Sequence, residues 1–255
     1  MTLTKNSKLT KTSLIIFSLL VLITCTTEKE AEPSNKAEAT STTEIWVHRV
    51  NSIMKWNEVS RSYNGIETDV VFENGRFDVN HPPAESIDLS LNELLSSQEN
   101  IDDFGVWLDF KNLTDDNAHD AMKRLNFIVD SLHIKRNRII IEAKNTKALS
   151  VFQESGFNAS YYVPTGMYAM DDDKLEETVT LIRNQIAAFP SLWISSNYKD
   201  YPFLKQHFPN RNKLFWETGG RQSYSAEESD SIVNQIKMDT TVMVLLVQVA
   251  TAVER

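Results

Sequence analysis

The stretch of sequence that decides the fold runs from residue 104 to residue 142 and holds two apolar runs with an amphipathic run between them. The apolar runs are FGVWLDF (104–110) and RIIIE (138–142), which have the length and the β-branched and aromatic content of buried parallel strands. Between them, apolar side chains recur at the three-to-four spacing of one helical face: Ala118, Met122, Leu125, Ile128, Val129 and Leu132. The stretch therefore predicts a strand–helix–strand unit with two parallel strands.

The same alternation of apolar and amphipathic runs continues on both sides of this unit. Further strands are predicted near residues 45–48, 66–72, 158–163, 191–195, 213–217 and 241–247, and further helices near 52–61, 89–98, 146–155, 171–188, 200–207 and 225–237. Eight such units predict an α/β protein of the (β/α)₈ TIM-barrel class, with a single domain at 44–255. The last helix is expected to be missing or truncated. A doubly wound open sheet is the alternative, which the lack of a Gly-rich turn after the first strand disfavours.

Residues 1–25 have the build of a secretory signal peptide, with lysines ahead of an apolar run at 14–23. That run is shorter than the ~20 residues that a membrane-spanning helix needs. It ends at Leu22-Ile23-Thr24-Cys25, which is similar to a bacterial lipobox, so Cys25 is the expected lipidation site; a chance cysteine is the alternative. Cys25 is the only cysteine, so no internal disulfide is expected in the mature protein.

Residues 26–43 carry no large apolar side chain and predict a flexible tether. The sequence thus indicates an exported bacterial membrane lipoprotein, periplasmic or surface-facing, whose folded domain lies outside the cytoplasm. The formal net charge of −9 disfavours a surface that coats nucleic acid. The expected partners are the membrane, through the lipid anchor, and a small ligand, and the expected state is a monomer.

Carboxylates gather at the carboxyl ends of predicted strands, where (β/α)₈ enzymes place their catalytic groups. Glu67 and Asp69 lie two apart in the second strand, and alternation points both to one face. Asp109 ends the third strand. Carboxylates that point into a barrel are costly unless a cation neutralises them, and three hard oxygen ligands suit one divalent cation, Mg²⁺ or Ca²⁺. These residues therefore predict a metal site.

The neighbouring polar residues suit chemistry on a phosphodiester. His48 ends the first strand and His81 follows the second, and both are candidates for a general acid–base pair. Arg49 and Lys111 are candidates for binding the anionic phosphate. The planar guanidinium of Arg49 can donate two hydrogen bonds to it, and the ammonium of Lys111 acts as a point charge. A bound divalent ion would neutralise a phosphodiester oxygen.

Each part of this site has a simpler explanation taken alone. A lone Glu-x-Asp is more often a solvent-facing strand edge, a single histidine near a strand end is usually structural, and Asp-x-Lys is usually a surface ion pair. Co-location favours a site, because all seven residues fall at the same end of the first three strands. The remaining histidines, His119, His133 and His207, are expected on solvated surfaces.

Later strands add weaker candidates at the same mouth, namely Glu142, Tyr162, Ser195, Asn197, Trp216 and Glu217. Glu142, followed by Lys144, is a candidate for a further metal ligand or for the rim that binds the phosphate. Trp216 is a candidate substrate contact. Barrel packing is the alternative for these aromatic residues and is preferred for Trp193.

Together the motifs resemble those of the glycerophosphodiester phosphodiesterase and phosphatidylinositol-phospholipase-C-like superfamily of barrels. The resemblance rests on His48-Arg49, Glu67-Thr68-Asp69 and His81. It implies that the two histidines are acid–base catalysts, that the Glu-x-Asp pair binds the metal, and that Asp109 supplies a third acidic ligand. The Asp109-Phe110-Lys111 segment looks closer to the spider-venom sphingomyelinase D branch, which implies a phosphate contact for the lysine.

The chain is still more similar to the menorin family, a branch of the same superfamily. The shared motifs are HRVNS (48–52), ETDV (67–70), HPP (81–83) and LDFK (108–111), within a resemblance that covers most of 45–250. Two positions depart from the diesterase pattern: Val50 replaces the glycine after His-Arg, and Pro82 replaces the aspartate after the second histidine. These changes leave the substrate headgroup open, and they make Asn51 a candidate for a ligand or phosphate contact.

Two functions are consistent with these residues. The first is a metal-assisted enzyme that hydrolyses or cyclises a phosphodiester in a glycerophosphodiester- or phospholipid-like substrate. The second is a non-catalytic, lipid-anchored barrel that binds a phosphorylated ligand or a surface partner. Metal-dependent turnover would separate the two.

Overall fold

The structure of the protein is a computed structural model that describes residues 43–99, 101–217 and 226–249. The predicted signal peptide, the lipidation site Cys25 and the tether as far as residue 42 lie outside the described residues. Thr43 is buried, and its hydroxyl donates to the carbonyls of Ile236 (3.1 Å) and Val242 (3.0 Å). Thr43 is therefore already part of the folded domain.

Eight parallel strands close into a barrel, which confirms the predicted (β/α)₈ class. The barrel strands are β1 (Glu44–Val47), β2 (Gly65–Glu73), β4 (Gly105–Phe110), β5 (Ile139–Ala143), β6 (Asn158–Tyr162), β7 (Trp193–Asn197), β8 (Lys213–Trp216) and β9 (Val242–Val247). The first strand closes the sheet, since β1 pairs in parallel with β9 on one side and with β2 on the other. The open-sheet alternative is therefore wrong.

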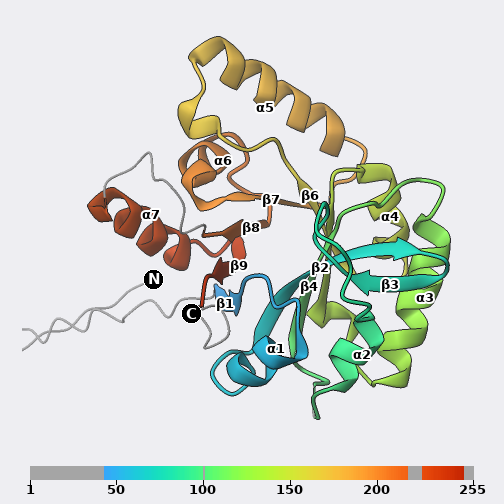
Figure 1. Cartoon of the computed structure of the whole chain (residues 1–255). Helices are drawn as coiled ribbons and strands as arrows, with labels where there is room; N and C mark the ends of the chain where they lie inside the picture. The colour runs from blue at the N-terminus through green and yellow to red at the C-terminus, as the bar shows by residue number, and fades with distance from the viewer. Residues whose placement is uncertain (1–42, 100, 218–225, 250–255) are drawn as a thin grey trace, which may run out of the picture. The chain divides into compact units, whose positions relative to one another are not determined.

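Helices connect successive barrel strands and surround the barrel (Figure 1). They are α1 (Ile53–Val59), α2 (Leu91–Ser96), α3 (Ala118–Ser131), α4 (Thr146–Glu154), α5 (Asp172–Ile186), α6 (Tyr201–His207) and α7 (Ala226–Met238). Short 3₁₀ turns occur at Arg136–Arg138, Met167–Ala169 and Tyr198–Asp200. No helix follows β9 in the described residues, which end at Val249. Within the described ranges, every helix is too short or too polar to cross a membrane.

The second barrel strand continues into a hairpin that the sequence analysis did not predict. It extends to Glu73, turns at Asn74 and Gly75, and returns as the antiparallel strand β3 (Arg76–Val79). Both turn residues have positive φ, 51° and 76°, which is the backbone that Asn-Gly favours in tight hairpins. Since Val79 pairs with Val70, the hairpin brings the chain back to the mouth of the barrel, next to Asp69.

Two apolar clusters hold the domain together. The larger one lies between the strands and the helices, and a smaller one contains residues from the barrel strands, namely Trp46, Trp107, Ile140, Leu214, Trp216, Val244 and Leu246. Trp46 lies against the backbone of Gly65 and Gly105, where an added Cβ would fall 2.3 Å and 2.0 Å from the indole ring. Glycine at these two positions is what lets the large ring fit against β2 and β4.

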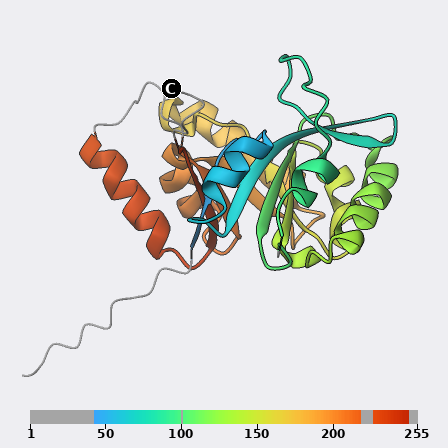
Figure 2. The ribbon, with the colours of Figure 1, turned by 60° about the horizontal axis from the view of Figure 1, so that its bottom comes forward.

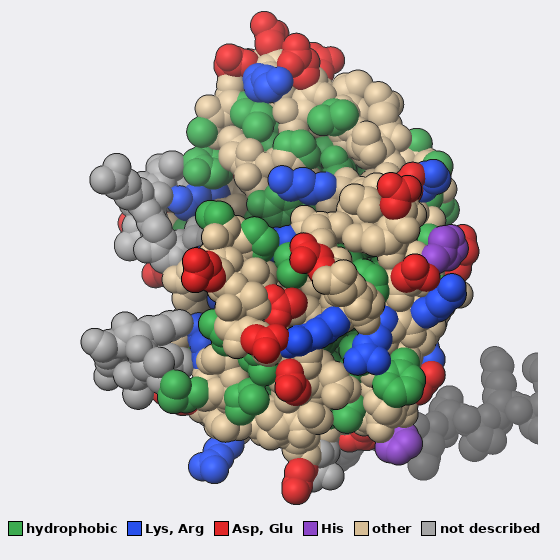
Figure 3. All heavy atoms as spheres, turned by 45° about the vertical axis from the view of Figure 1, so that its right-hand side comes forward, with side chains coloured by type: hydrophobic (Ala, Val, Ile, Leu, Met, Phe, Trp, Pro, Cys, Tyr) green, Lys and Arg blue, Asp and Glu red, His purple; other side chains and the backbone are tan. Residues whose placement is uncertain are grey.

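The surface carries both signs of charge. On the face shown in Figure 3, acidic and basic side chains are interspersed and hydrophobic side chains are scattered between them. Many of these charges pair, as in the surface contacts of Lys135 with Asp103 (2.7 Å) and of Lys147 with Asp115 (2.6 Å).

Candidate active site

Three carboxylates lie close together on the neighbouring strands β2 and β4, at the carboxyl end of β4. Glu67, Asp69 and Asp109 each offer an oxygen, and these oxygens lie within 4.8 Å of one another. The strand register explains the cluster, because Asp69 is directly opposite Asp109 and Glu67 is two residues earlier on the same face. Glu67 and Asp69 are buried, with 2% and 1% of their surface exposed. The structure thus brings the predicted metal ligands together.

Lys111 supplies positive charge to this cluster. Its ammonium lies 2.6 Å from Asp69 Oδ1 and also contacts the carboxylate of Asp109. Burial opposes the charge on Lys111, but Asp109 and Asp69 together hold its pKa above the usual value. Burial raises the pKa of Asp109 despite this contact, and the lysine partly offsets the rise. The predicted phosphate-binding lysine is therefore an ion-pair partner of two candidate metal ligands.

Glu67 is held by the chain that follows β1. The backbone N–H of Arg49 donates to Glu67 Oε2 at 2.7 Å, and His48 Nε2 lies 3.6 Å from the same oxygen. Arg49 adopts a left-handed backbone, with φ of 56°, and its side chain is exposed. Burial, followed by the charges of Asp69 and Asp109, raises the pKa of Glu67 well above its usual value. The other oxygen, Oε1, is buried and has no hydrogen-bond partner among the described residues.

Asn51 positions the second carboxylate. Its amide nitrogen donates to Asp69 Oδ2 at 2.6 Å, and its carbonyl oxygen accepts from the Asp69 backbone N–H (3.0 Å) and the Thr68 hydroxyl (2.9 Å). Both ends of the amide are thus engaged by the strand that carries the candidate ligands. The structure gives Asn51 a role in orienting Asp69, whereas its predicted contact with substrate stays a prediction.

The two candidate acid–base histidines differ in exposure. The side chain of His48 is 11% exposed, and burial, together with the charge of Arg49, lowers its pKa to about 4. His81 follows β3, is 43% exposed, and places Nε2 3.9 Å from Asp69 Oδ1. The loop after β3, drawn in green, stands out from the body of the domain in Figure 2. One histidine is therefore neutral and enclosed, and the other lies at an exposed rim.

Glu142 is a fourth acidic residue in the site. It lies on β5 directly opposite Asp109 of β4, and it is buried. The indole N–H of Trp107 donates to Glu142 Oε2 at 3.0 Å, while Oε1 has no hydrogen-bond partner among the described residues. Burial and the charge of Asp109 raise the pKa of Glu142 well above its usual value. Burial in the barrel thus opposes the charge of Glu142.

Aromatic rings form another part of the site. Tyr162 and Trp216 stack with ring centroids 5.1 Å apart and an interplanar angle of 5°, and Trp107 meets Trp216 edge-on at 6.4 Å. Trp107 is not among the site residues expected from the sequence. Strand alternation could have identified it, because Trp107 lies two residues before Asp109 and therefore points to the same face.

Most of these groups line one cavity of about 110 Å³ at the mouth of the barrel. Its walls include the two histidines, Arg49, Lys111 and the aromatic residues, together with Glu67, Asp69, Asp109, Glu142 and Leu246. Asn51 lies behind Asp69 and is not among the lining residues. The hydroxyl of Ser195 lowers the pKa of Glu142, but the opposing effect of burial is larger.

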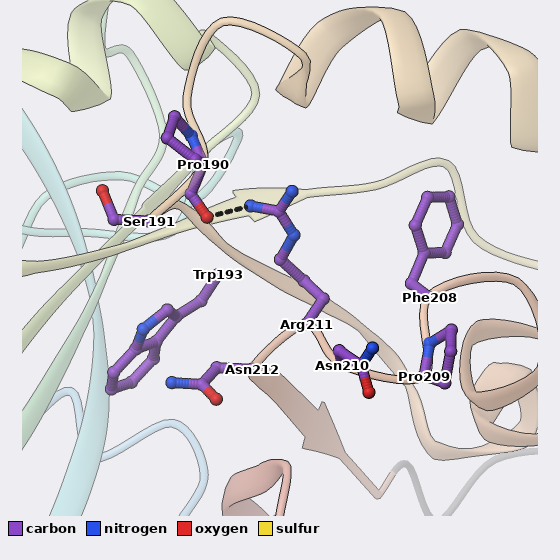
Figure 4. Close-up of a pocket in the computed structure, with 8 residues that line it drawn as sticks. All are labelled: Pro190, Ser191, Trp193, Phe208, Pro209, Asn210, Arg211 and Asn212. Atoms are coloured by element: carbon purple, nitrogen blue, oxygen red, sulfur yellow. Dashed lines mark hydrogen bonds between the residues drawn. The ribbon is translucent and has the colours of Figure 1, made fainter.

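A larger cavity, of about 520 Å³, lies among the loops that enter β7 and β8, at the opposite end of the barrel strands. Figure 4 shows its lining, which consists of Pro190, Ser191, Trp193, Phe208, Pro209, Asn210, Arg211 and Asn212. No histidine or carboxylate is among these eight residues. The Arg211 guanidinium donates to the carbonyls of Phe189, Pro190 and Leu192, so the arginine ties a loop together. This cavity lacks the groups that the predicted chemistry needs.

No protein-family model and no curated protein sequence matches this chain. Solved structures do match. The chain is similar to a glycerophosphodiester phosphodiesterase from Parabacteroides distasonis, with 15% identity, 81% of this chain and 93% of that chain covered, and a TM-score of 0.54. The corresponding enzyme from Thermotoga maritima gives 12% identity, coverage of 80% and 94%, and a TM-score of 0.52.

A phosphodiesterase from Oleispira antarctica, solved in complex with the product sn-glycerol-3-phosphate, is also similar. It gives 10% identity, coverage of 79% of this chain and 92% of that chain, and a TM-score of 0.50. At these levels of identity the likeness establishes a common fold.

Proposed function

We propose that this chain is a metal-assisted phosphoric diester hydrolase, or a diester-cyclising enzyme, of the glycerophosphodiester phosphodiesterase and phospholipase-C-like superfamily. The observation that carries the proposal is the cluster of Glu67, Asp69 and Asp109 at the mouth of a barrel of the fold seen in glycerophosphodiester phosphodiesterases. The motifs at 48–52, 67–70, 81–83 and 108–111 support placement in the menorin branch.

The three carboxylates fit a divalent cation. Their oxygens lie within 4.8 Å of one another, all are hard donors, and the buried Oε1 of Glu67 has no hydrogen-bond partner among the described residues. Glu67, Asp69 and Asp109 would hold Mg²⁺ or Ca²⁺, which when bound would neutralise and polarise the phosphodiester. Burial is the main cause of the raised pKa of Glu67, and a cation would also relieve the repulsion from Asp69 and Asp109 that adds to it.

The chain's own residues supply the remaining functions. His48, enclosed and neutral, is suited to accept the proton of the attacking hydroxyl, which belongs to water in hydrolysis and to the substrate itself in cyclisation. His81, at the exposed rim, is suited to protonate the leaving oxygen. Arg49 and Lys111 add positive charge where the phosphate binds. Asn51 holds Asp69 in place, and Trp216 with Tyr162 forms an aromatic wall for the rest of the substrate.

The proposed substrate is a glycerophosphodiester- or phospholipid-like molecule. The Oleispira antarctica phosphodiesterase is described with sn-glycerol-3-phosphate as product, which supports a glycerol-linked diester as the first substrate to test. A lipid anchor at Cys25, on an exported monomer, would hold the domain beside membrane phospholipids.

A non-catalytic binding barrel is the second candidate, and one observation favours it. The ammonium of Lys111 already contacts two of the three carboxylates, so the cluster is partly neutralised without an ion. A barrel of this kind would bind a phosphorylated ligand and release no product.

The proposal is tested by a screen of phosphodiesters with Mg²⁺, with Ca²⁺ and with EDTA. We expect metal-dependent turnover, and loss of at least about 100-fold in His48→Ala and in His81→Ala, with the fold retained by circular dichroism. Full activity in either variant would remove the acid–base pair. Ligand binding without turnover of any diester would favour the binding barrel.

A further inference from the structure

A second cavity lies beside the first at the mouth of the barrel. It has a volume of about 210 Å³ and is lined by Asp109, Phe110, Lys111, Leu113, Ala143, Lys144 and Tyr162. Three of these residues, Asp109, Lys111 and Tyr162, also line the first cavity. Each cavity alone is smaller than the ~300–1,000 Å³ of ordinary ligand sites, so a substrate with its phosphodiester in the first cavity would extend into the second.

The two cavities differ in charge. Four acidic side chains and two cationic ones line the first: Glu67, Asp69, Asp109, Glu142, Arg49 and Lys111. The second cavity is lined by one acidic side chain, that of Asp109, and by two lysines, Lys111 and Lys144. The first cavity therefore suits a metal cation, whereas the second suits an anionic group.

Lys144 is the distinctive cation of the second cavity. It directly follows β5, and its ammonium lies 5.3 Å from the centroid of the Tyr162 ring. No carboxylate pairs with Lys144 in the part of the chain that the structure describes, whereas Lys111 is engaged by both Asp69 and Asp109. Lys144 thus keeps its charge available to a ligand.

The aromatic surroundings also disfavour a cationic headgroup here. Tyr162 already has the Trp216 ring stacked on it and the ammonium of Lys144 over it. A quaternary ammonium would have to approach the same ring against the repulsion of a lysine.

We propose that the second cavity binds the leaving-group portion of the substrate, and that Lys144 makes the enzyme prefer a headgroup with its own anionic group, a carboxylate or a second phosphate. This inference rests on the proposed function for the position of the phosphodiester in the first cavity. Lys144 acts as a specificity-determining residue and takes no part in the reaction itself.

Two probes that differ by one phosphate test the inference: glycerophosphoinositol and glycerophosphoinositol 4-phosphate. Calorimetry measures the binding of both probes to two proteins. One is the variant His48→Ala, in which turnover is prevented, and the other is the double variant that also carries Lys144→Met. We expect His48→Ala to bind glycerophosphoinositol 4-phosphate about tenfold more tightly than glycerophosphoinositol. A tenfold difference is at the low end of the usual contribution of a hydrogen bond to a charged group, because Lys144 is exposed. Lys144→Met should abolish that preference, because it should weaken the binding of the phosphorylated probe by about tenfold more than the binding of glycerophosphoinositol.

Lys147→Met is the matched control, because Lys147 is an exposed lysine on α4 that pairs with Asp115 outside both cavities. It should keep the tenfold preference. The inference is overturned if His48→Ala binds neither probe at millimolar concentration, if it binds both equally, or if the preference survives Lys144→Met. Turnover by the wild-type protein is scored separately, so that a binding preference without catalysis would count against the proposed function alone.

Discussion

The ammonium of Lys111 lies 2.6 Å from Asp69 Oδ1 and also contacts Asp109, so one lysine offsets part of the charge of two of the three carboxylates of the candidate metal site. Removing it would leave a buried acidic cluster without its nearest cation. We expect Lys111→Met to lower the free energy of unfolding in EDTA by about 2–3 kcal/mol, somewhat less than a fully buried pair because Lys111 is partly exposed.

Urea denaturation with and without Mg²⁺ or Ca²⁺ measures this effect. The gain in stability on adding metal should be larger in Lys111→Met than in the wild type, because the ion takes over the role of the lysine. Lys123→Met, which removes an exposed lysine paired with Asp120, is the control and should change little. Equal stability of Lys111→Met and the wild type in EDTA would show that the lysine does not offset the acidic charge.

Asn51 should control metal affinity without being a ligand. Loss of its amide removes the 2.6 Å hydrogen bond to Asp69 Oδ2, so Asn51→Ala should weaken metal binding by about 10–100-fold, the usual effect of groups that orient a ligand. Calorimetric titration with Mg²⁺ and Ca²⁺ measures the change. Asn184→Ala, on the exposed surface of α5, is the control. An unchanged dissociation constant in Asn51→Ala would mean that Asp69 needs no such support.

The fit of Trp46 against β4 should make Gly105 intolerant of a side chain. An added Cβ would lie 2.0 Å from the Trp46 ring, and the buried indole cannot move away, so Gly105→Ala should cost about 2–3 kcal/mol of stability. Chemical denaturation measures the cost. The comparison is Gly75→Ala, which has open space around it and only an unfavourable positive φ, and which should cost about 1 kcal/mol. A larger loss at Gly75 than at Gly105 would contradict the close packing of the barrel interior.

The pH dependence of stability should reveal the network around Asp239. Burial opposes its charge, but hydrogen bonds from Lys205 and Thr241 outweigh burial and lower its pKa to about 2. Since the folded pKa is below the unfolded value of about 3.9, the carboxylate stabilises the fold above pH ~4 and loses this effect as the pH falls toward 2.

Asp239→Asn should therefore be less stable than the wild type by about 1–2 kcal/mol near pH 7, and this difference should shrink near pH 3. Denaturation of both proteins at the two pH values is the measurement. Asp103→Asn, at an exposed pair with Lys135, is the control and should have a much smaller effect. A difference that stays constant with pH would mean that the carboxylate charge of Asp239 does not contribute.

Much of the fold could be predicted from the sequence because each buried parallel strand has its own apolar run. The run at 104–110, for example, corresponds to β4 (Gly105–Phe110). The hairpin after β2 was missed, although Asn74-Gly75 between alternating residues is a strong hairpin pattern. Barrel closure depends on the pairing of β1 with β9, which joins residues 200 positions apart and has no local pattern.

The candidate site was predictable in part for the same reason. Alternation and strand ends place Glu67, Asp69 and Asp109 at one mouth, and the structure brings them within 4.8 Å of one another. Two features could not be predicted because they depend on side-chain conformations. They are the position of Lys111 between two carboxylates and the second cavity beside Lys144. Spacing in the sequence places Asp109 and Lys111 on one face, but it does not show that Lys111 also contacts Asp69 or that a cavity lies beside Lys144.

The central claim is metal-assisted phosphodiester hydrolysis or cyclisation at Glu67, Asp69 and Asp109. Its most direct test is the rate of turnover of a glycerophosphodiester as a function of Mg²⁺ or Ca²⁺ concentration, in the wild type and in Asp69→Asn. We expect a rate that saturates with metal, is abolished by EDTA, and falls by at least about 100-fold in Asp69→Asn. Turnover that persists in EDTA, or that Asp69→Asn leaves unchanged, would contradict the central claim.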